Sequence, residues 1–341
     1  MGNRVFLAMA LAVVAGFATA SAWAADSAVV VTYNRFDDDR TPATNTRLDQ
    51  LAAQITELKS GGYTVLPLPQ VVDALRTGKP LPDKTVALTI DGAWASVWEH
   101  AWPRLQAAGL PFTVFVGTDE ADRGSVDSMN WEQLRQLAAS SLVTIGSQGA
   151  GHPHMPALAA SAVAEDLHRA HIRFEAELGK APDLLAWPYG EMSREAVEIA
   201  RAAGFKAAFG QHSGPVWSKS DLFFLPRFPL NETYGEAERF RLAVRSLPLP
   251  AVDVTPADPR IGANPPAFGF TLASEVPGME HLACYTSHEG RAVIERLGPR
   301  IEVRMTKPLP QGRARLNCTA PSLEGRWRWF GWQFYVGAGG S

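Results

Sequence analysis

The stretch Thr85-Val-Ala-Leu-Thr-Ile-Asp91-Gly92-Ala-Trp94 decides the fold, together with the run Leu110-Pro-Phe-Thr-Val-Phe-Val116 that follows it after a helical segment. An apolar run ends at one carboxylate, a helix comes next, and a second apolar run follows. This order predicts a strand, a helix and another strand, with Asp91 at the carboxyl end of the first strand. In parallel α/β folds the loops at that edge of the sheet converge, and functional residues collect there. Asp91 is therefore the first candidate functional residue.

Strands and helices alternate in the same way through most of the chain. This alternation predicts an α/β domain with a parallel sheet, either doubly wound or closed into a barrel. Apolar runs predict further strands at 28–33, 63–66, 142–145, 184–187 and 206–209. Helical spacing of apolar residues predicts helices at 47–60, 68–77, 130–139, 157–179 and 194–203.

The pattern changes after about residue 247. Six prolines between positions 248 and 266 interrupt any helical periodicity and predict a linker. Short strand-like runs separated by Gly and Pro turns follow, at 268–272, 282–285, 301–305, 314–318 and 326–336. They predict a small β-sandwich as a second domain. Cys284 and Cys318 lie in two of these strands and form either one disulfide or two separate buried thiols.

Composition and the first residues limit the class of protein. The 341 residues are 46% hydrophobic and carry a net charge of −3, with no basic run, which argues against a nucleic-acid binder. Arg4, the apolar stretch 5–17 and Ala22-Trp-Ala24 predict a signal peptide over residues 1–24, with a retained membrane anchor as the alternative. We expect the mature chain, residues 25–247 and 248–341, to be periplasmic or secreted, with no further membrane span.

Three further loops follow predicted strands and carry polar residues. They are Gly146-Ser-Gln148-Gly-Ala-Gly-His152-Pro-His154, Trp187-Pro188-Tyr189-Gly190-Glu191 and Gly210-Gln211-His212-Ser213. In a parallel sheet, all of them emerge on the same side as Asp91. This convergence predicts an active site at the carboxyl edge of the sheet.

Over about residues 28–230, the order of these motifs resembles the polysaccharide deacetylase (NodB-homology) family. The resemblance implies a distorted (β/α) barrel that hydrolyses N- or O-acetyl groups of glycans. It also implies a divalent, zinc-type metal that activates a water molecule, an aspartate base, a histidine acid and a Pro-Tyr-Gly turn that holds the oxyanion.

Carried over position by position, the resemblance makes Asp91 the base and His212 the acid. It places the backbone N–H that supports the oxyanion in the turn at Tyr189. Of the three expected metal ligands, this chain keeps only His152, because the other two positions hold Gly92 and Gln148. Glycine offers no ligand, and an amide oxygen is a poor zinc ligand beside imidazole or carboxylate. His154 is a conceivable replacement, but in an extended segment it points away from His152.

Aromatic residues near the predicted mouth suggest how a sugar is bound. We expect Trp94 to present a ring to a sugar face, with the intact turn residues Pro188 and Gly190 beside it. Trp187 lies either along the groove or in the core. In the last strand, Trp327 and Trp329 are either sandwich core or a platform for a glycan.

Two functions remain open at this point. The first is an enzyme that removes acetyl groups from an envelope or extracellular polysaccharide. The second is a glycan-binding pseudoenzyme that keeps the groove and has lost the metal. In both, the partner is a polysaccharide or oligosaccharide. A purely structural envelope protein would leave Asp91 and the Pro-Tyr-Gly turn without a purpose.

Overall fold

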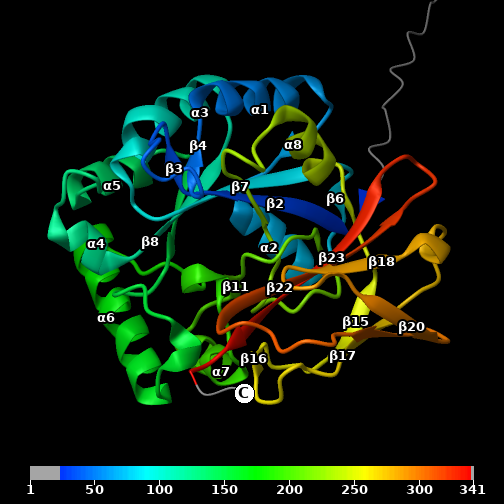
Figure 1. Ribbon diagram of the computed structural model, residues 1–341. Helices are drawn as coiled ribbons and strands as arrows, with labels where there is room; N and C mark the ends of the chain where they lie inside the picture. Colours follow the sequence, from blue (N-terminus) through cyan, green and yellow to red (C-terminus); the bar gives the residue numbers. More distant parts are fainter. Residues whose placement is uncertain (1–23, 339–341) are drawn as a thin grey trace, which may run out of the picture.

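The computed structural model of the protein describes residues 24–338 (Figure 1). The predicted signal peptide, residues 1–24, lies outside this part except for Ala24. Within the described part, no helix is both long enough and apolar enough to cross a membrane.

A curled, mostly parallel sheet forms the centre of the N-terminal part. Its strands follow the order β11-β10-β9-β8-β7-β2-β12, with β13 beside β2 and β5 beside β7. The two ends of this order do not pair with each other, so the sheet is a half-barrel and not the closed form that the resemblance allowed. Its strands are β2 (Ser27–Tyr33), β5 (Thr64–Val65), β7 (Thr85–Asp91), β8 (Phe112–Val116), β9 (Val143–Ser147), β10 (Leu184–Ala186), β11 (Ala207–Phe209), β12 (Val216–Trp217) and β13 (Phe228–Pro229).

The strand β7 shows why the apolar run forms the middle of this sheet. All seven of its residues are buried, because strands pair with it on both sides and helices cover the sheet. Parallel pairing with β2 and β8 brings the carboxyl ends of the three strands to one edge. Asp91 is the last residue of β7 and is therefore held at that edge.

The helices have the periodicity expected from the sequence. In the longest, α6, the apolar residues Val163, Leu167, Ala170 and Phe174 form one buried face. Asn130 and Gln133 form a capping box that begins α5. The helices are α1 (Leu48–Ser60), α2 (Leu68–Thr77), α3 (Trp102–Ala108) after a π-helical turn, α4 (Thr118–Arg123), α5 (Trp131–Ala138), α6 (Ala160–Leu178), α7 (Arg194–Ala202) and α8 (Ala237–Val244).

The C-terminal strands form two sheets. One has the order β14-β23-β22-β18-β19, with β16 beside β23, and the other has the order β15-β17-β21-β20. The bounds are β14 (Leu247–Pro248), β15 (Ala251–Thr255), β16 (Arg260–Ile261), β17 (Phe268–Leu272), β18 (Ala283–Thr286), β19 (Gly290–Arg291), β20 (Val293–Leu297), β21 (Arg300–Arg304), β22 (Gly312–Pro321) and β23 (Trp327–Val336). Cys284 and Cys318 lie directly opposite each other on β18 and β22 and form a disulfide.

The predicted linker is wrong. The proline-rich stretch 248–266 contains β14, β15 and β16, which pair with β23, β17 and β23 respectively. Prolines are accommodated because they stand at strand ends and in the loops between these strands.

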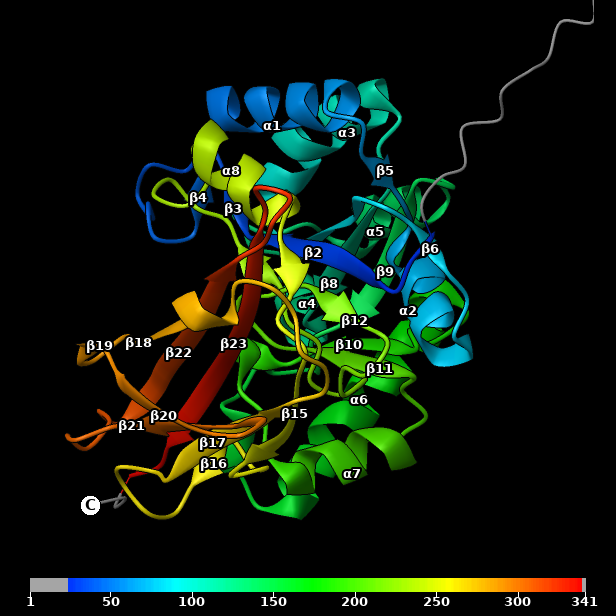
Figure 2. The same cartoon turned by 90° about the vertical axis from the view of Figure 1, so that its right-hand side faces the viewer.

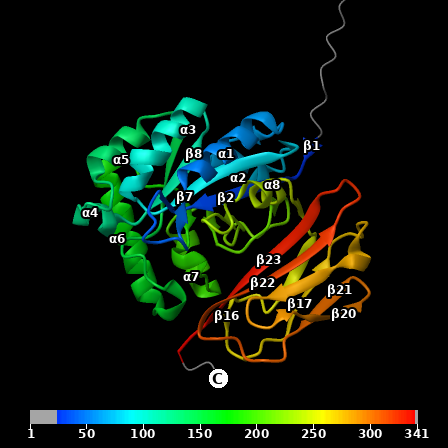
Figure 3. The same ribbon diagram turned by 45° about the horizontal axis from the view of Figure 1, so that its top comes forward.

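The C-terminal sheets pack directly against the half-barrel, on one side of it (Figures 2 and 3). Trp187 and Phe224 of the N-terminal part share one hydrophobic cluster with Phe268 and Trp332 of the C-terminal sheets. The long β22–β23 pair contacts the half-barrel, because Arg313 of β22 and Gln333 of β23 donate hydrogen bonds to Tyr189 O.

Candidate functional site

A groove of about 690 Å³ opens at the carboxyl edge of the half-barrel. The loops after β7, β9, β10 and β11 contribute Asp91, Gln148 with His152, Tyr189 and Gln211 to its lining. The four loops singled out in the sequence therefore meet at one place. Arg313 and Arg315 of β22 also line this groove, so the C-terminal part completes it.

Asp91 is clamped by a buried arginine. Arg227 Nη1 donates to Asp91 Oδ1 at 2.6 Å and Arg227 Nη2 donates to Oδ2 at 2.8 Å, an almost fully buried bidentate pair. Arg227 also donates to Gly210 O and to the hydroxyls of Thr32 and Thr89. Because these partners satisfy the guanidinium, it holds the carboxylate in one orientation.

Sequence reasoning missed Arg227. It stands alone among apolar residues in Leu225-Pro-Arg227-Phe-Pro-Leu230, and it is completely buried. A single arginine inside an apolar run signals a buried carboxylate partner, because an unpaired buried charge is strongly disfavoured.

Asp91 retains some capacity to accept a further hydrogen bond. Gln211 Nε2 donates to Asp91 Oδ2 at 3.0 Å, so Arg227 and Gln211 together supply three donors. A carboxylate accepts about four hydrogen bonds. One further donor, such as a water molecule or a sugar hydroxyl, can therefore be bound from the groove.

Gly92 has a backbone conformation and surroundings that exclude a side chain. Its φ is +94°, and a Cβ at this position would collide with the indole of Trp94. Trp94 Nε1 donates to Asp91 O at 3.1 Å, and the Arg35 guanidinium lies 3.6 Å from the centre of its ring. The indole is thus fixed in the space that a ligand at position 92 would need.

Gln148 occupies the second altered position. Its side chain is only 2% exposed, and its Nε2 has no hydrogen-bond partner within the described residues. A buried amide N–H without an acceptor is costly, so this position favours a bound acceptor such as a water molecule or a carbonyl oxygen.

His152 and His154 lie against the same ring, Tyr189. The His152 ring meets it edge-on at 4.5 Å between centroids, and the His154 ring stacks on it at 4.2 Å. The segment is not extended, because His152 has a φ of +54°, so the condition under which His154 was expected to point away from His152 does not apply; only His152 lines the groove. His154 Nδ1 lies 2.6 Å from Glu191 Oε2 and is held there, while burial lowers the pKa of His152 and favours its neutral imidazole.

The expected zinc-type metal does not fit these residues. Between residues 24 and 338, no three His, Cys, Asp or Glu side chains lie together as a metal-binding group. His152 is the only one of the three inherited ligand positions with a ligating side chain. Trp94 fills the space beside Gly92, and Gln148 offers at most an amide.

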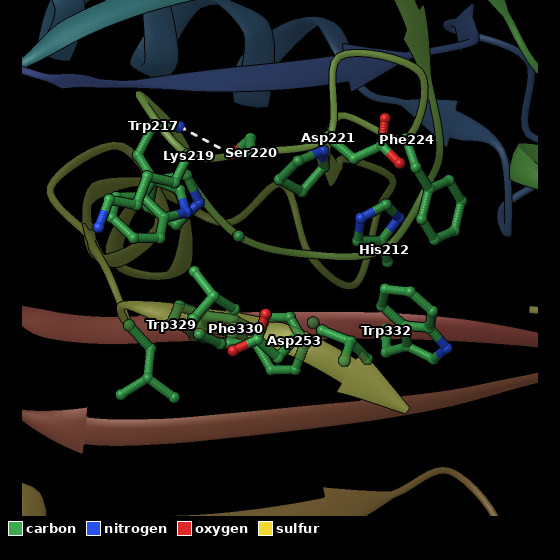
Figure 4. Close-up of a pocket in the computed structure, with 18 of the residues that line it drawn as sticks. His212, Trp217, Lys219, Ser220, Asp221, Phe224, Asp253, Trp329, Phe330 and Trp332 are labelled. Carbon is green, nitrogen blue, oxygen red and sulfur yellow. Dashed lines mark hydrogen bonds between the residues drawn. The ribbon is translucent and has the colours of Figure 1, made fainter. Parts of the chain in front are cut away.

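His212 does not reach the groove. It lines a separate cavity of about 410 Å³ between the loop after β11 and strand β23, where its ring packs at 4.1 Å on Phe224 (Figure 4). Burial lowers the pKa of His212 to about 3, so the imidazole is neutral near pH 7. The prediction that His212 is the catalytic acid is therefore wrong.

Three predicted substrate-binding residues are buried supports. Trp187 is fully buried, and its Nε1 donates to Phe223 O at 2.8 Å, so it belongs to the core and not to the groove. Pro188 and Gly190 are also buried, and neither lines the groove. Gly190 has a φ of +70°, and a Cβ there would meet the backbone of Gln211. Trp94, by contrast, does line the groove.

The C-terminal sheet holds the Pro-Tyr-Gly turn in place. Arg313 Nη1 and Gln333 Nε2 donate to Tyr189 O at 3.3 Å and 3.1 Å. Gly190 N and Glu191 N donate within the turn, to Trp187 O and Pro188 O. Since Pro188 has no N–H, Tyr189 N carries the turn's remaining backbone donor.

Comparisons with known proteins agree with this fold. Residues 78–208 match the family model described as polysaccharide deacetylase. A poly-beta-1,6-N-acetyl-D-glucosamine N-deacetylase of Escherichia coli (strain K12) is 26% identical over 249 residues, which cover 60% of this chain and 37% of that protein. The protein of the same name from Staphylococcus aureus (strain N315) is 23% identical over 198 residues, covering 54% of this chain and 67% of that one.

Among solved structures, IcaB from Ammonifex degensii is similar to this chain with a TM-score of 0.58 and 25% identity. The match covers 65% of this chain and 98% of that one. This chain spans only about 37% of the length of the Escherichia coli relative. The half-barrel and these matches show that the N-terminal part of the chain, above all residues 78–208, is similar to the polysaccharide deacetylase family.

Proposed function

We propose that this chain binds an acetylated polysaccharide in the groove and hydrolyses its N- or O-acetyl groups. The observation that carries the proposal is the convergence of Asp91, His152, Tyr189 and Gln211 on one groove of a deacetylase-type half-barrel. The names of the relatives, which are N-deacetylases of a poly-N-acetylglucosamine, support the same reaction class.

The proposed chemistry uses the chain's own residues. A water molecule attacks the acetyl carbonyl carbon while Asp91 accepts its proton. The bond from that carbon to the sugar nitrogen or oxygen then breaks, and the Asp91 carboxyl returns the proton to the leaving amine or hydroxyl. The products are acetate and the free sugar group. Asp91 does both proton transfers in this scheme because His212 is out of reach.

Two donors are proposed to hold the acetyl oxygen. In the described part of the chain, Tyr189 N–H makes no backbone hydrogen bond outside its own turn, and Gln148 Nε2 is a buried donor without a partner. Donors fixed in advance at a developing negative charge stabilise the transition state. Because the residues do not fit a zinc-type metal, no step is assigned to one.

A second candidate function is glycan binding without hydrolysis. One observation favours it: the Trp94 indole occupies the place of the ligand missing at Gly92. A groove that keeps its shape and its aromatic and polar lining binds sugar whether or not the acetyl group is cleaved. The two candidates differ only in the release of acetate.

The domain organisation and the cellular compartment of the protein are part of the same proposal. We propose that the two C-terminal sheets form a β-sandwich domain over residues 248–341, beside a deacetylase-like domain over 25–247. We also propose that the mature protein works in the periplasm or outside the cell. The disulfide between Cys284 and Cys318 supports an oxidising compartment.

Acetate release tests the proposal. Purified protein is incubated with β-1,6-linked N-acetylglucosamine oligomers and with an O-acetylated xylan, and free acetate is measured. We expect acetate from the unmodified chain and none from Asp91→Asn, with His168→Gln on the exposed side of α6 as the matched control. Sugar binding without any acetate from either substrate would overturn hydrolysis and leave the second candidate.

A further inference from the structure

Two arginines of the C-terminal part face the groove that contains Asp91. In β22, burial alternates, so Ala314 and Leu316 lie in the core while Arg313 and Arg315 lie on the opposite face. Both arginines line the groove. The groove therefore has a wall of mixed charge from the half-barrel and a cationic wall from β22.

Arg315 has no counter-ion. Among the described residues, no carboxylate oxygen lies within 4.0 Å of its guanidinium, and its only side-chain hydrogen bond is a long one, 3.5 Å from Nε to Gln333 Oε1. Burial and the neighbouring Arg313 lower the pKa of Arg315, because both disfavour its charged form. An anion bound beside Arg315 would compensate it.

A second cavity of about 250 Å³ continues from this position. It shares Arg315, Tyr234, Pro229 and Leu230 with the groove, and it adds Arg239, Tyr285 and Trp329. No Asp or Glu of the described chain lines this cavity. We call the groove and this cavity together the extended groove.

Arg239, like Arg315, lines this cavity without a carboxylate partner among the described residues. Its guanidinium lies 5.0 Å from the ring centre of Trp329 and 5.8 Å from that of Tyr234, and it forms no ion pair within the described part of the chain. Burial lowers the pKa of Arg239. Tyr234 and Tyr285 are 45% and 44% exposed, so both offer ring faces to a sugar.

The balance of charge along the extended groove is positive. Five arginines line it, against the two carboxylates Asp91 and Glu120; Arg35 pairs with Asp38 and Arg313 with Glu191, so the uncompensated arginines among the described residues are Arg123, Arg239 and Arg315. Asp91 is already neutralised by Arg227, and burial raises the pKa of Glu120. This local excess contrasts with the net charge of −3 of the whole chain, so it is a property of the site.

We propose that the extended groove binds an acidic polysaccharide, and that Arg315 and Arg239 hold its anionic groups while the exposed tyrosines contact its sugar rings. The planar guanidinium pairs with a carboxylate or phosphate through two parallel hydrogen bonds. The proposal deepens the proposed function by naming the substrate class. Its binding part holds whether or not acetyl groups are cleaved.

Binding of the full chain to matched polymers tests this inference. Isothermal titration compares an oligogalacturonate, a glycerol-phosphate polymer and a neutral chito-oligosaccharide of similar length, using the Asp91→Asn variant so that no substrate is consumed. We expect at least one anionic polymer to bind tenfold or more tightly than the neutral one, with affinity that falls as salt rises. The tighter of the two anionic polymers identifies the group as carboxylate or phosphate.

Variants locate the effect. Arg315→Gln and Arg239→Gln should each weaken binding of the anionic polymer about tenfold and leave neutral-sugar binding unchanged, while Arg296→Gln, an exposed arginine on β20, should change neither. Arg315→Lys, which keeps the charge and loses the fork, should fall between. Equal affinity for neutral and anionic polymers, or unchanged affinity in both glutamine variants, would overturn the inference. Loss of acetate release alone would count against the proposed function and not against this one.

Discussion

The indole of Trp94 stands in the space that a side chain at Gly92 would occupy, and its Nε1 is hydrogen-bonded to the carbonyl of Asp91. The altered ligand position is therefore more than a missing carboxylate. The Trp94 indole fills the space that a side chain at position 92 would need, and the positive φ of Gly92 favours glycine. These two residues form one packed unit beside the residue proposed to carry the chemistry.

Restoring an aspartate at position 92 should therefore disrupt the fold locally before it creates a metal ligand. We expect Gly92→Asp to lower the free energy of unfolding by more than Gly124→Asp, the matched control. Gly124 also has a positive φ, +58°, but nothing lies within 4 Å of a Cβ there, so it reports the backbone cost alone, about 1 kcal/mol. The double variant Gly92→Asp/Trp94→Ala should recover part of the extra free energy of unfolding that Gly92→Asp loses relative to Gly124→Asp. Equal losses in urea unfolding for the two aspartate variants would contradict the packing of Trp94 against Gly92.

Removing Arg227 should be among the most damaging single changes in the chain. Arg227→Met leaves the buried carboxylate of Asp91 without its partner, and we expect a loss of about 3–5 kcal/mol in urea unfolding. The double variant Asp91→Asn/Arg227→Met should lose less than the sum of the two single variants. Arg304→Met, which breaks an exposed pair with Glu295, serves as the control and should cost less than about 1 kcal/mol. Additive losses would show that the Asp91–Arg227 pair is not coupled.

Burial of neutral His212 predicts a dependence of stability on pH. The folded-state pKa is lowered from 6.5 to about 3, so between these values the unfolded chain binds more protons than the folded one. Stability from this group is complete above about pH 6.5 and falls as the pH drops toward 3. Replacing the ring by His212→Phe should flatten the decrease in the urea midpoint between pH 7 and pH 4, whereas His168→Gln on α6 should not. Identical slopes for the His212 variant and the unmodified chain would show that the imidazole is not buried in its neutral form.

Substitutions of Trp94 and Trp187 should have different effects, since we expect the first to weaken glycan binding and the second to lower the stability of the fold. Trp187→Phe removes the buried hydrogen bond to Phe223 O, and we expect a loss of about 1–3 kcal/mol in stability with glycan affinity unchanged. Trp94→Phe keeps an aromatic ring at the groove but removes the hydrogen bond to Asp91 O, and we expect weaker glycan binding with a smaller loss of stability. A loss of affinity in a folded Trp187→Phe variant would place Trp187 at the sugar after all.

Much of the fold follows from local patterns. The run 85–91 became a strand with the expected bounds, and the predicted helix at 68–77 is α2. In both segments the apolar pattern was clear, and a glycine follows the last residue, Gly92 after the strand and Gly78 after the helix. The proline-rich stretch was misjudged because strand pairing with β23, a partner about 80 residues away, outweighs local composition.

The site was harder to predict than the sheet. The convergence of four loops follows from parallel strand order alone, and so Asp91, His152, Tyr189 and Gln211 do meet. Whether a side chain in these loops is buried or lines the groove does not follow from the strand order. Trp187 and His212 stand in the same loops but turn away from the groove. Arg313 and Arg315 reach the groove, and Arg227 reaches Asp91 from below, from segments outside those loops. Such long-range partners carry no local sequence signal apart from an isolated charge in an apolar run.

The most direct measurement is a crystal structure of the Asp91→Asn variant with a bound acetylated acidic oligosaccharide. The account predicts sugar density in the extended groove, with an acetyl group beside residue 91 and the Tyr189 turn, and with an anionic group on Arg315. Sugar density in the cavity beside His212 and Trp332, with the extended groove empty, would contradict it.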